Sequence, residues 1–144
     1  MNASEIRQKY LDYMQSKGHA VVQPAPLVLE NDPTTLFTGS GMQPLLSYLL
    51  GQPHPAGKRL TDSQPCLRLQ DINDVGDPRH TTVFEMLGNW SLGDYFKEEQ
   101  IRNFFTFLTK EVGLDPHKLY VTCFIGDVIY GLPRVDEAAK LWQQ

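Results

Sequence analysis

The sequence has little of several features that mark whole classes of protein. Two cysteines occur in 144 residues, Cys66 and Cys123, and they do not form a CxxC pair. A disulfide framework or a zinc site is therefore not expected, and free thiols favour a reducing cytoplasm. No apolar stretch approaches the length of a membrane span, and the N-terminus lacks the apolar core of a signal peptide. We accordingly expect a cytoplasmic protein without a membrane partner.

Clustered positive charge is also missing. The formal net charge is −4, and no run of lysine and arginine exceeds two residues. Affinity for a phosphate backbone depends on clustered cations, so this chain alone is expected to bind nucleic acid poorly. Any such partner would need other regions or other chains.

Several catalytic and ligand-binding signatures are absent as well. The sequence has no internal repeat and no GxxxxGK[ST], GxGxxG or HExxH pattern. Gly39-Ser40-Gly41 superficially resembles a phosphate loop, but a turn before a helix is the more common meaning of such a stretch. His19, His54 and His117 have no acidic or thiol partner at metal spacing, so no metal site is predicted.

What is present fits a soluble globular protein. Hydrophobic residues make up 41% of the chain and aromatic residues 10%, and 144 residues suit one domain with a real core. Apolar residues at helical spacing predict a first helix at 4–17, capped by Ser4 and ended at Lys17-Gly18. Further helices are expected at 44–51, at 97–112 and from 134 onward, with strands near 21–22, 63–69, 80–87 and 118–126 and a turn at Asn31-Asp32-Pro33. Helices mixed with mostly antiparallel strands predict an α+β domain.

Cations are placed at the loop-side ends of the two central predicted strands. Arg68 lies on an apolar strand, and Arg79 and His80 would lie near it across the hairpin. Two guanidinium groups and an imidazole at one end of a sheet could hold a polyphosphate, because arginine binds phosphate bidentately and stays charged. The alternative is an exposed ion-pair network, which spacing alone favours because such pairs are common on surfaces. Its acidic partners would be Asp71, Asp74 or Asp77.

A second candidate site is Phe84-Glu85-Met86 on the following strand. A flat aromatic ring can stack on a base, and the strand backbone can bind the edge of adenine. Glu85 could anchor either an arginine or a ribose. The alternative for Phe84 and Met86 is ordinary core packing, which is the usual role of a single apolar residue.

Longer stretches carry a family resemblance. Six of them, in collinear order, are similar to alanyl-tRNA synthetase read from its first residue, and FEMLGN followed by GDYFKEE is highly specific to that family. The resemblance covers essentially the whole chain. It implies a class II aminoacyl-tRNA synthetase-like catalytic core, in which an antiparallel sheet is flanked by helices. The six stretches are IRQKYLDYMQSKGHAVV, LVLENDPTTLFTGSGMQP, KRLTDSQPCLR, NDVG, RHTTVFEMLGNWSLGDYFKEEQI and LYVTCF.

The resemblance also implies a reaction and roles for individual residues. ATP, accompanied by Mg²⁺, would bind bent on the sheet and react with alanine to give alanyl-adenylate, from which the alanyl group passes to tRNA(Ala). Arg68 would bridge the α-phosphate and the alanine carboxylate as the catalytic residue. Arg79 and His80 would face the β- and γ-phosphates. Phe84, Glu85 and Met86 would form the adenine-recognising strand. Val83 stands where the family usually has an aromatic, so stacking rests on Phe84 alone or the strand turns its other face.

The resemblance extends only to the first part of such a synthetase. Residues 1–144 are expected to be the N-terminal portion of the catalytic domain, with the first and second class II motifs but not the third. The chain is therefore expected to supply the ATP-binding part of an alanine–tRNA ligase, to be inactive alone, and to reach tRNA mostly through other regions. It could also be one chain of a split synthetase, part of a homodimer, a non-catalytic nucleotide-binding or regulatory module, or an interaction domain.

Overall fold

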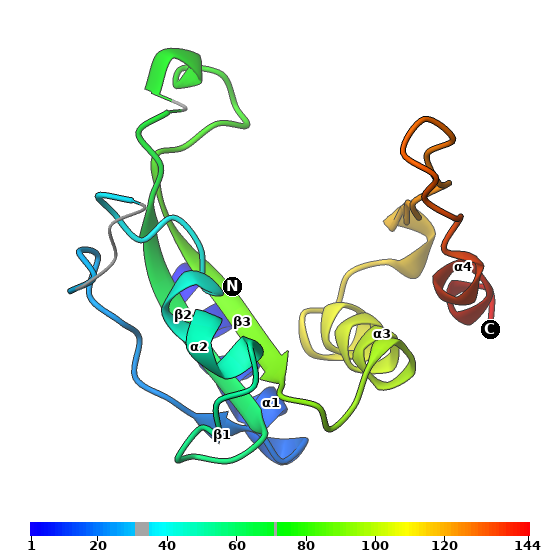
Figure 1. Ribbon diagram of the computed structural model, residues 1–144, viewed down its shortest axis with the longest axis horizontal. Helices are drawn as coiled ribbons and strands as arrows, with labels where there is room; N and C mark the ends of the chain where they lie inside the picture. Colours follow the sequence, from blue (N-terminus) through cyan, green and yellow to red (C-terminus); the bar gives the residue numbers. More distant parts are fainter. Residues whose placement is uncertain (31–34, 71) are drawn as a thin grey trace. The chain divides into compact units, whose positions relative to one another are not determined.

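The computed structural model describes residues 1–30, 35–70 and 72–144 of the chain (Figure 1). These residues divide into two compact units, Met1–Asp94 and Tyr95–Gln144, whereas the length alone favours one domain. The turn predicted at Asn31-Asp32-Pro33 and the side chain of Asp71 lie outside the described residues.

The first unit is built on a three-stranded sheet in the order β1-β2-β3. The strands are β1 (Ala20–Val21), β2 (Arg59–Leu67) and β3 (Val83–Ser91). The long pair β2–β3 is antiparallel, from Arg59 opposite Ser91 to Leu67 opposite Val83. The short β1 runs parallel to β2, so the sheet is mixed. The predicted α+β class is confirmed.

Helices cover both faces of this sheet. Figure 1 shows α1 (Ala3–Ser16) on one face and α2 (Leu46–Leu49), preceded by the 3₁₀ turn Gln43–Leu45, on the other. Apolar side chains from these elements are buried against the strands because burial removes them from water. In the described residues of either unit, no helix is long and apolar enough to cross a membrane. The buried apolar residues of this unit are Tyr10, Tyr13, Met14, Leu45, Leu60 and Cys66.

Helix α1 lies where the sequence predicts it, but its N-terminal cap is a different residue. The side chain of Asn2 accepts a hydrogen bond from the Glu5 amide (2.9 Å), and the Glu5 carboxylate accepts one from the Asn2 amide (3.0 Å). This reciprocal capping box satisfies two amides that have no partner inside the helix. Ser4 lies inside the helix, so its prediction as the cap is wrong. Gly18, with φ of 84°, follows the end of the helix as predicted.

The β2–β3 hairpin is shifted away from its loop relative to the predicted strands. It extends further at its base, to Arg59 and Ser91, and its ladder stops at Leu67 and Val83. Arg68 adds one bond beyond the ladder, from its amide to the Thr82 carbonyl (2.8 Å). The chain then leaves the extended conformation, with a 3₁₀ turn at Ile72–Asp74 and Gly76 at φ of 132°. Arg79 and His80, predicted at the strand end, therefore lie in the loop.

The second unit is helical. It contains α3 (Lys97–Thr106), which continues into a π-helical turn at Phe107–Glu111, a 3₁₀ turn at Pro116–Lys118, and α4 (Asp136–Trp142). The predicted helices at 97–112 and from 134 are confirmed. The strand predicted at 118–126 is wrong. A strand needs a ladder of backbone bonds to a neighbour, and among the described residues the segment has a single bond to a later part of the chain, from the Val135 amide to the Phe124 carbonyl (3.1 Å). Its apolar side chains are exposed, with Tyr120 at 93% and Ile125 at 80%.

The capping box gives a test of how α1 begins. Replacing Asn2 by alanine removes the acceptor for the Glu5 amide and is expected to lower the free energy of unfolding by about 1 kcal/mol. Urea unfolding followed by circular dichroism measures this change. Ser4→Ala is the matched control and is expected to have almost no effect. Equal losses in the two variants would show that Asn2 is not the cap.

Candidate functional site

Arg68 is held by two contacts just beyond the end of β2. Its Nε donates a hydrogen bond to the Gly39 carbonyl (2.8 Å), and its guanidinium lies 5.1 Å from the centre of the Phe84 ring. A cation over an aromatic face is attracted by the negative charge of the ring. Within the described ranges, neither Nη atom of Arg68 has a hydrogen-bond partner. As far as the described residues go, the outer edge of this fixed guanidinium is therefore open to an anion.

The carbonyl that holds Arg68 belongs to a segment fixed beside β2. The Leu67 amide donates to the Thr38 carbonyl (2.9 Å), and the Thr38 amide and hydroxyl donate to Leu27 and Pro26 carbonyls (2.6 and 2.9 Å). The Gly39 amide donates to the side chain of Gln43 (3.0 Å). Gly39-Ser40-Gly41 thus forms the predicted turn before a helix. Its contact with Arg68 was not predicted, because a loop's distant partner is not encoded in local spacing.

Met86 lies on the same face of the sheet as Phe84. Its sulfur accepts a hydrogen bond from the Gly41 amide (3.1 Å). Next along β3, the indole of Trp90 lies across Gly88 so closely that a Cβ at position 88 would be 2.2 Å from it. Only glycine fits there. Trp90 also lies 3.2 Å from where a Cβ of Gly41 would be, so the glycine turn packs directly on this face.

The two faces of β3 carry different residues because successive side chains of a strand point to opposite sides. We call the face of Phe84, Met86, Gly88 and Trp90 the α2 face, and the opposite one the α1 face. Glu85 lies on the α1 face, where its carboxylate accepts hydrogen bonds from Arg7 Nε and Nη2 (2.5 Å each) and from the Ser63 hydroxyl (2.7 Å). These bonds, those from Arg7 first, lower the pKa of Glu85 to about 2. Of its two predicted roles, this geometry supports the arginine anchor and not contact with a ribose.

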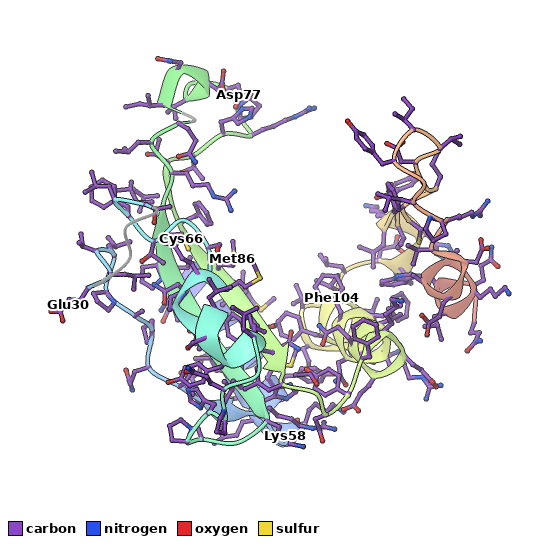
Figure 2. The ribbon with its side chains drawn as sticks, viewed as in Figure 1. Glu30, Lys58, Cys66, Asp77, Met86 and Phe104 are labelled. Carbon is purple, nitrogen blue, oxygen red and sulfur yellow. The ribbon has the colours of Figure 1, made fainter. Side chains whose placement is uncertain are left out.

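Arg79 and His80 lie in the hairpin loop, where Asp77 organises the backbone. The Asp77 carboxylate accepts from the amides of Arg79 and His80 (2.8 and 2.7 Å) and pairs with His80 Nδ1 (2.8 Å). These hydrogen bonds, with that from the Arg79 amide as the main cause, lower the pKa of the Asp77 carboxyl. Figure 2 shows Asp77 at the outer end of the loop, beyond Cys66 and Met86 on the sheet.

The predicted cations lie on different segments: Arg68 just beyond the end of β2, and Arg79 and His80 in the hairpin loop. Among the described residues, no hydrogen bond, ion pair or ring contact joins Arg68 to Arg79 or His80. For the alternative of an acidic surface network, the structure describes two of the three predicted acids, because Asp71 lies outside the described residues. Neither Asp74 nor Asp77 forms an ion pair with the guanidinium of Arg68 or Arg79, and Asp77 pairs with His80 instead.

Asp62 is a buried acid that the sequence analysis did not single out. It lies on β2 opposite Gly88, is 5% exposed, and its Oδ1 has no hydrogen-bond partner among the described residues. Burial disfavours the charged carboxylate and raises its pKa to about 7. The signal in the sequence is the strand period of two. Asp62 shares one face of β2 with Leu60, Gln64 and Cys66, which are all buried.

Taken together, the α2 face combines a fixed cation with an aromatic and thioether wall. Arg68 offers two N–H-bearing nitrogens to an anion, and Phe84 and Met86 offer apolar surface beside it. A ligand with a planar apolar ring and a nearby negative charge suits this arrangement. Among the described residues, no group of three histidine, cysteine, aspartate or glutamate side chains could hold a metal ion.

Comparisons with known proteins agree on one family. A family model described as tRNA synthetases class II (A) matches residues 5–144. An alanine–tRNA ligase from Treponema denticola is 55% identical over 141 residues, which cover 96% of this chain and 23% of the relative. Alanine–tRNA ligases from Treponema pallidum and Cytophaga hutchinsonii are 51% and 47% identical over the whole chain, which covers 24% and 17% of their lengths. The chain spans about a quarter of the length of the first of these relatives.

The buried carboxyl of Asp62 gives a test by pH. Its pKa in the folded state, about 7, lies above the ordinary value of 3.8. Between these two pH values the folded protein keeps a proton on Asp62 that the unfolded chain releases. The resulting contribution to the free energy of unfolding is full below pH 3.8 and is lost as the pH rises through 7. Between pH 5 and pH 8 we expect it to fall by about 2 kcal/mol.

Urea unfolding at several pH values measures this dependence. Asp62→Asn cannot titrate and is expected to lose stability less steeply between pH 5 and pH 8 than the unmodified chain. Asp12→Asn, which changes an exposed carboxylate on α1, is the control and should keep the original slope. Parallel pH dependences for the unmodified chain and Asp62→Asn would contradict the assignment.

Proposed function

Because the chain belongs to the class II tRNA synthetases (A), we propose that it is the N-terminal, ATP-binding part of an alanine–tRNA ligase. The observation that carries this proposal is the position of Arg68. Its guanidinium is fixed between the Gly39 carbonyl and the Phe84 ring, and no other described residue bonds its outer edge.

The reaction proposed for the intact protein has two steps. A carboxylate oxygen of alanine attacks the α-phosphorus of ATP, a bond forms between them, and the bond to pyrophosphate breaks. A ribose hydroxyl of the terminal adenosine of tRNA then attacks the alanyl carbonyl carbon. The ester bond forms, the hydroxyl loses its proton, the bond between the alanyl group and AMP breaks, and AMP leaves. Negative charge accumulates around the α-phosphate in the first step, where a cation held in advance lowers the barrier. Arg68 is proposed for that role, because a guanidinium can bond the carboxylate and the phosphate together.

Adenine is proposed to bind beside Arg68 on the same face. Phe84 would supply the stacking surface and the backbone of Met86 the polar contacts to the base. Val83 precedes Phe84 and is 65% exposed, so the stacking role falls to Phe84. Because Phe84 touches Arg68, the base and the α-phosphate would lie close together, which suits a bent ATP molecule.

Arg79 and His80 are proposed to meet the β- and γ-phosphates from the hairpin loop. Their side chains are exposed, and the loop is organised around Asp77 rather than tied to Arg68.

Other components of the reaction are proposed from the family. Mg²⁺ would arrive with ATP, since this ion commonly binds through substrate phosphates, a few carboxylates and water. Alanine is the second substrate and tRNA(Ala) the acceptor, reached mostly through regions outside residues 1–144. A second copy or a complementing chain would be a further partner. The cytoplasm is the proposed compartment, because both cysteines are free thiols.

The proposal is tested by alanine-dependent exchange of pyrophosphate into ATP, measured on the intact protein that contains this chain. Arg68→Ala removes a contact made in the transition state and is expected to lower the exchange rate at least about 100-fold, or about 3 kcal/mol. Arg68→Lys keeps the charge but not the planar fork, so most of the loss should remain.

Arg102→Ala is the matched control for this experiment. Arg102 is an exposed arginine on α3 that pairs with Glu98 (2.6 Å), and its loss should leave exchange unchanged. An Arg68→Ala variant with normal exchange would refute the role of Arg68. An intact protein that binds ATP without exchange would indicate a non-catalytic nucleotide-binding module, and one without ATP binding would indicate an interaction domain.

A further inference from the structure

Three elements meet at the carboxylate of Glu85 on the α1 face. Arg7 of α1 donates from Nε and Nη2, each at 2.5 Å, to the two different oxygens. The hydroxyl of Ser63 on β2 donates to one of these oxygens at 2.7 Å. Glu85 itself belongs to β3. One side chain of β3 is thus fastened both to the helix that covers this face and to the neighbouring strand.

This arrangement differs from an ordinary surface ion pair. The side chains of Arg7 and Glu85 are 36% and 41% exposed, and exposed pairs with a single contact contribute little. A bidentate arginine–carboxylate pair is directional, because both N–H groups must align with both oxygens. The bond from Ser63 adds a third constraint. The carboxylate position is therefore fixed in direction as well as in distance.

The residues on either side of Glu85 are the proposed adenine-binding residues. Phe84 and Met86 project to the α2 face, where they contact Arg68 and the Gly41 amide. Their backbone is continuous with that of Glu85, so any rotation of this part of β3 that moves the Glu85 carboxylate moves both of them as well.

We propose that Arg7, Glu85 and Ser63 form a clamp that positions Phe84 and Met86 for the adenine of ATP from the opposite face of the sheet. These are positioning residues, since none of them faces the proposed ATP site. The inference rests on the proposed function. It gives the α1 helix a direct part in nucleotide affinity, which neither the resemblance nor the comparisons assign.

The clamp is tested by exchange kinetics on the intact protein. Arg7→Lys keeps the charge without the bidentate fork, and Glu85→Gln keeps the shape without the charge. In both variants we expect the KM for ATP to rise about tenfold, which corresponds to about 1.4 kcal/mol. The KM for alanine and kcat should change much less, because Arg68 is untouched. A purely structural role would instead lower kcat through loss of folded protein and leave the KM for ATP unchanged, which would overturn the proposal.

A charge-exchanged pair and a control pair sharpen this comparison. The exchanged pair Arg7→Glu with Glu85→Arg restores opposite charges and should recover part of the affinity for ATP relative to either single exchange. The control is the pair Glu98 and Arg102 on α3, another exposed glutamate–arginine pair of this chain. Glu98→Gln and Arg102→Lys should leave every kinetic constant unchanged. A similar rise in the KM for ATP in these control variants would also overturn the proposal.

A structural measurement separates this inference from the proposed function. Methionine methyl groups labelled with ¹³C report on Met86 at the site and on Met14, which is fully buried in α1. In the 144-residue chain, Glu85→Gln should shift the Met86 signal and leave that of Met14 in place. An unchanged Met86 signal would refute the clamp whatever the activity. A shifted Met86 signal in this chain, together with no exchange by the intact protein, would refute the proposed function and keep the clamp.

Discussion

The antiparallel register of β2 and β3 is the constraint on which the candidate site depends. Leu67 lies opposite Val83, and the Arg68 amide extends the pairing by one bond to Thr82. This register places the Arg68 guanidinium over the ring of Phe84. A shift of one residue would move Phe84 and Met86 to the α1 face and remove them from Arg68. The proposed cation and the proposed adenine wall are adjacent only in the observed pairing.

The two faces of the β2–β3 pair carry different sets of contacts. On the α2 face, the turn of Gly39 and Gly41 contacts Arg68 and Met86 through backbone groups. On the α1 face, Arg7 and Ser63 hold Glu85. The backbone carbonyl of Gly39 and the amide of Gly41 are suited to fixing Arg68 and Met86, because their positions follow from the fold rather than from side-chain rotamers. The glycines at 41 and 88 let the turn and the Trp90 ring pack close to the sheet. The edge of Arg68 that is proposed to bind an anion therefore belongs to a residue whose other contacts are fixed by the fold.

Local patterns in the sequence predicted the elements better than their ends or their partners. The helices at the N-terminus and after residue 96 have clear apolar stripes, and both are present. The cap at Asn2 was missed because Ser4 is an equally good capping residue by composition. The segment 118–126 has strand-like composition, but forming a strand depends on a neighbouring chain segment, which composition cannot reveal. Arg68 and Phe84 could be paired from a hairpin prediction, whereas the contacts of Gly39 and Arg7 connect residues far apart in the chain. The family resemblance is the source of the proposed site residues, and the strand period explains why Glu85 faces away from Phe84 and Met86.

The central claim is that ATP binds on the α2 face with its α-phosphate at Arg68 and its base at Phe84 and Met86. The most direct measurement is a crystal structure of the intact protein with a non-hydrolysable ATP analogue. The account predicts density for the α-phosphate within hydrogen-bond distance of the Arg68 Nη atoms and for adenine against the Phe84 ring. Nucleotide density elsewhere, or on the α1 face beside Glu85, would contradict it.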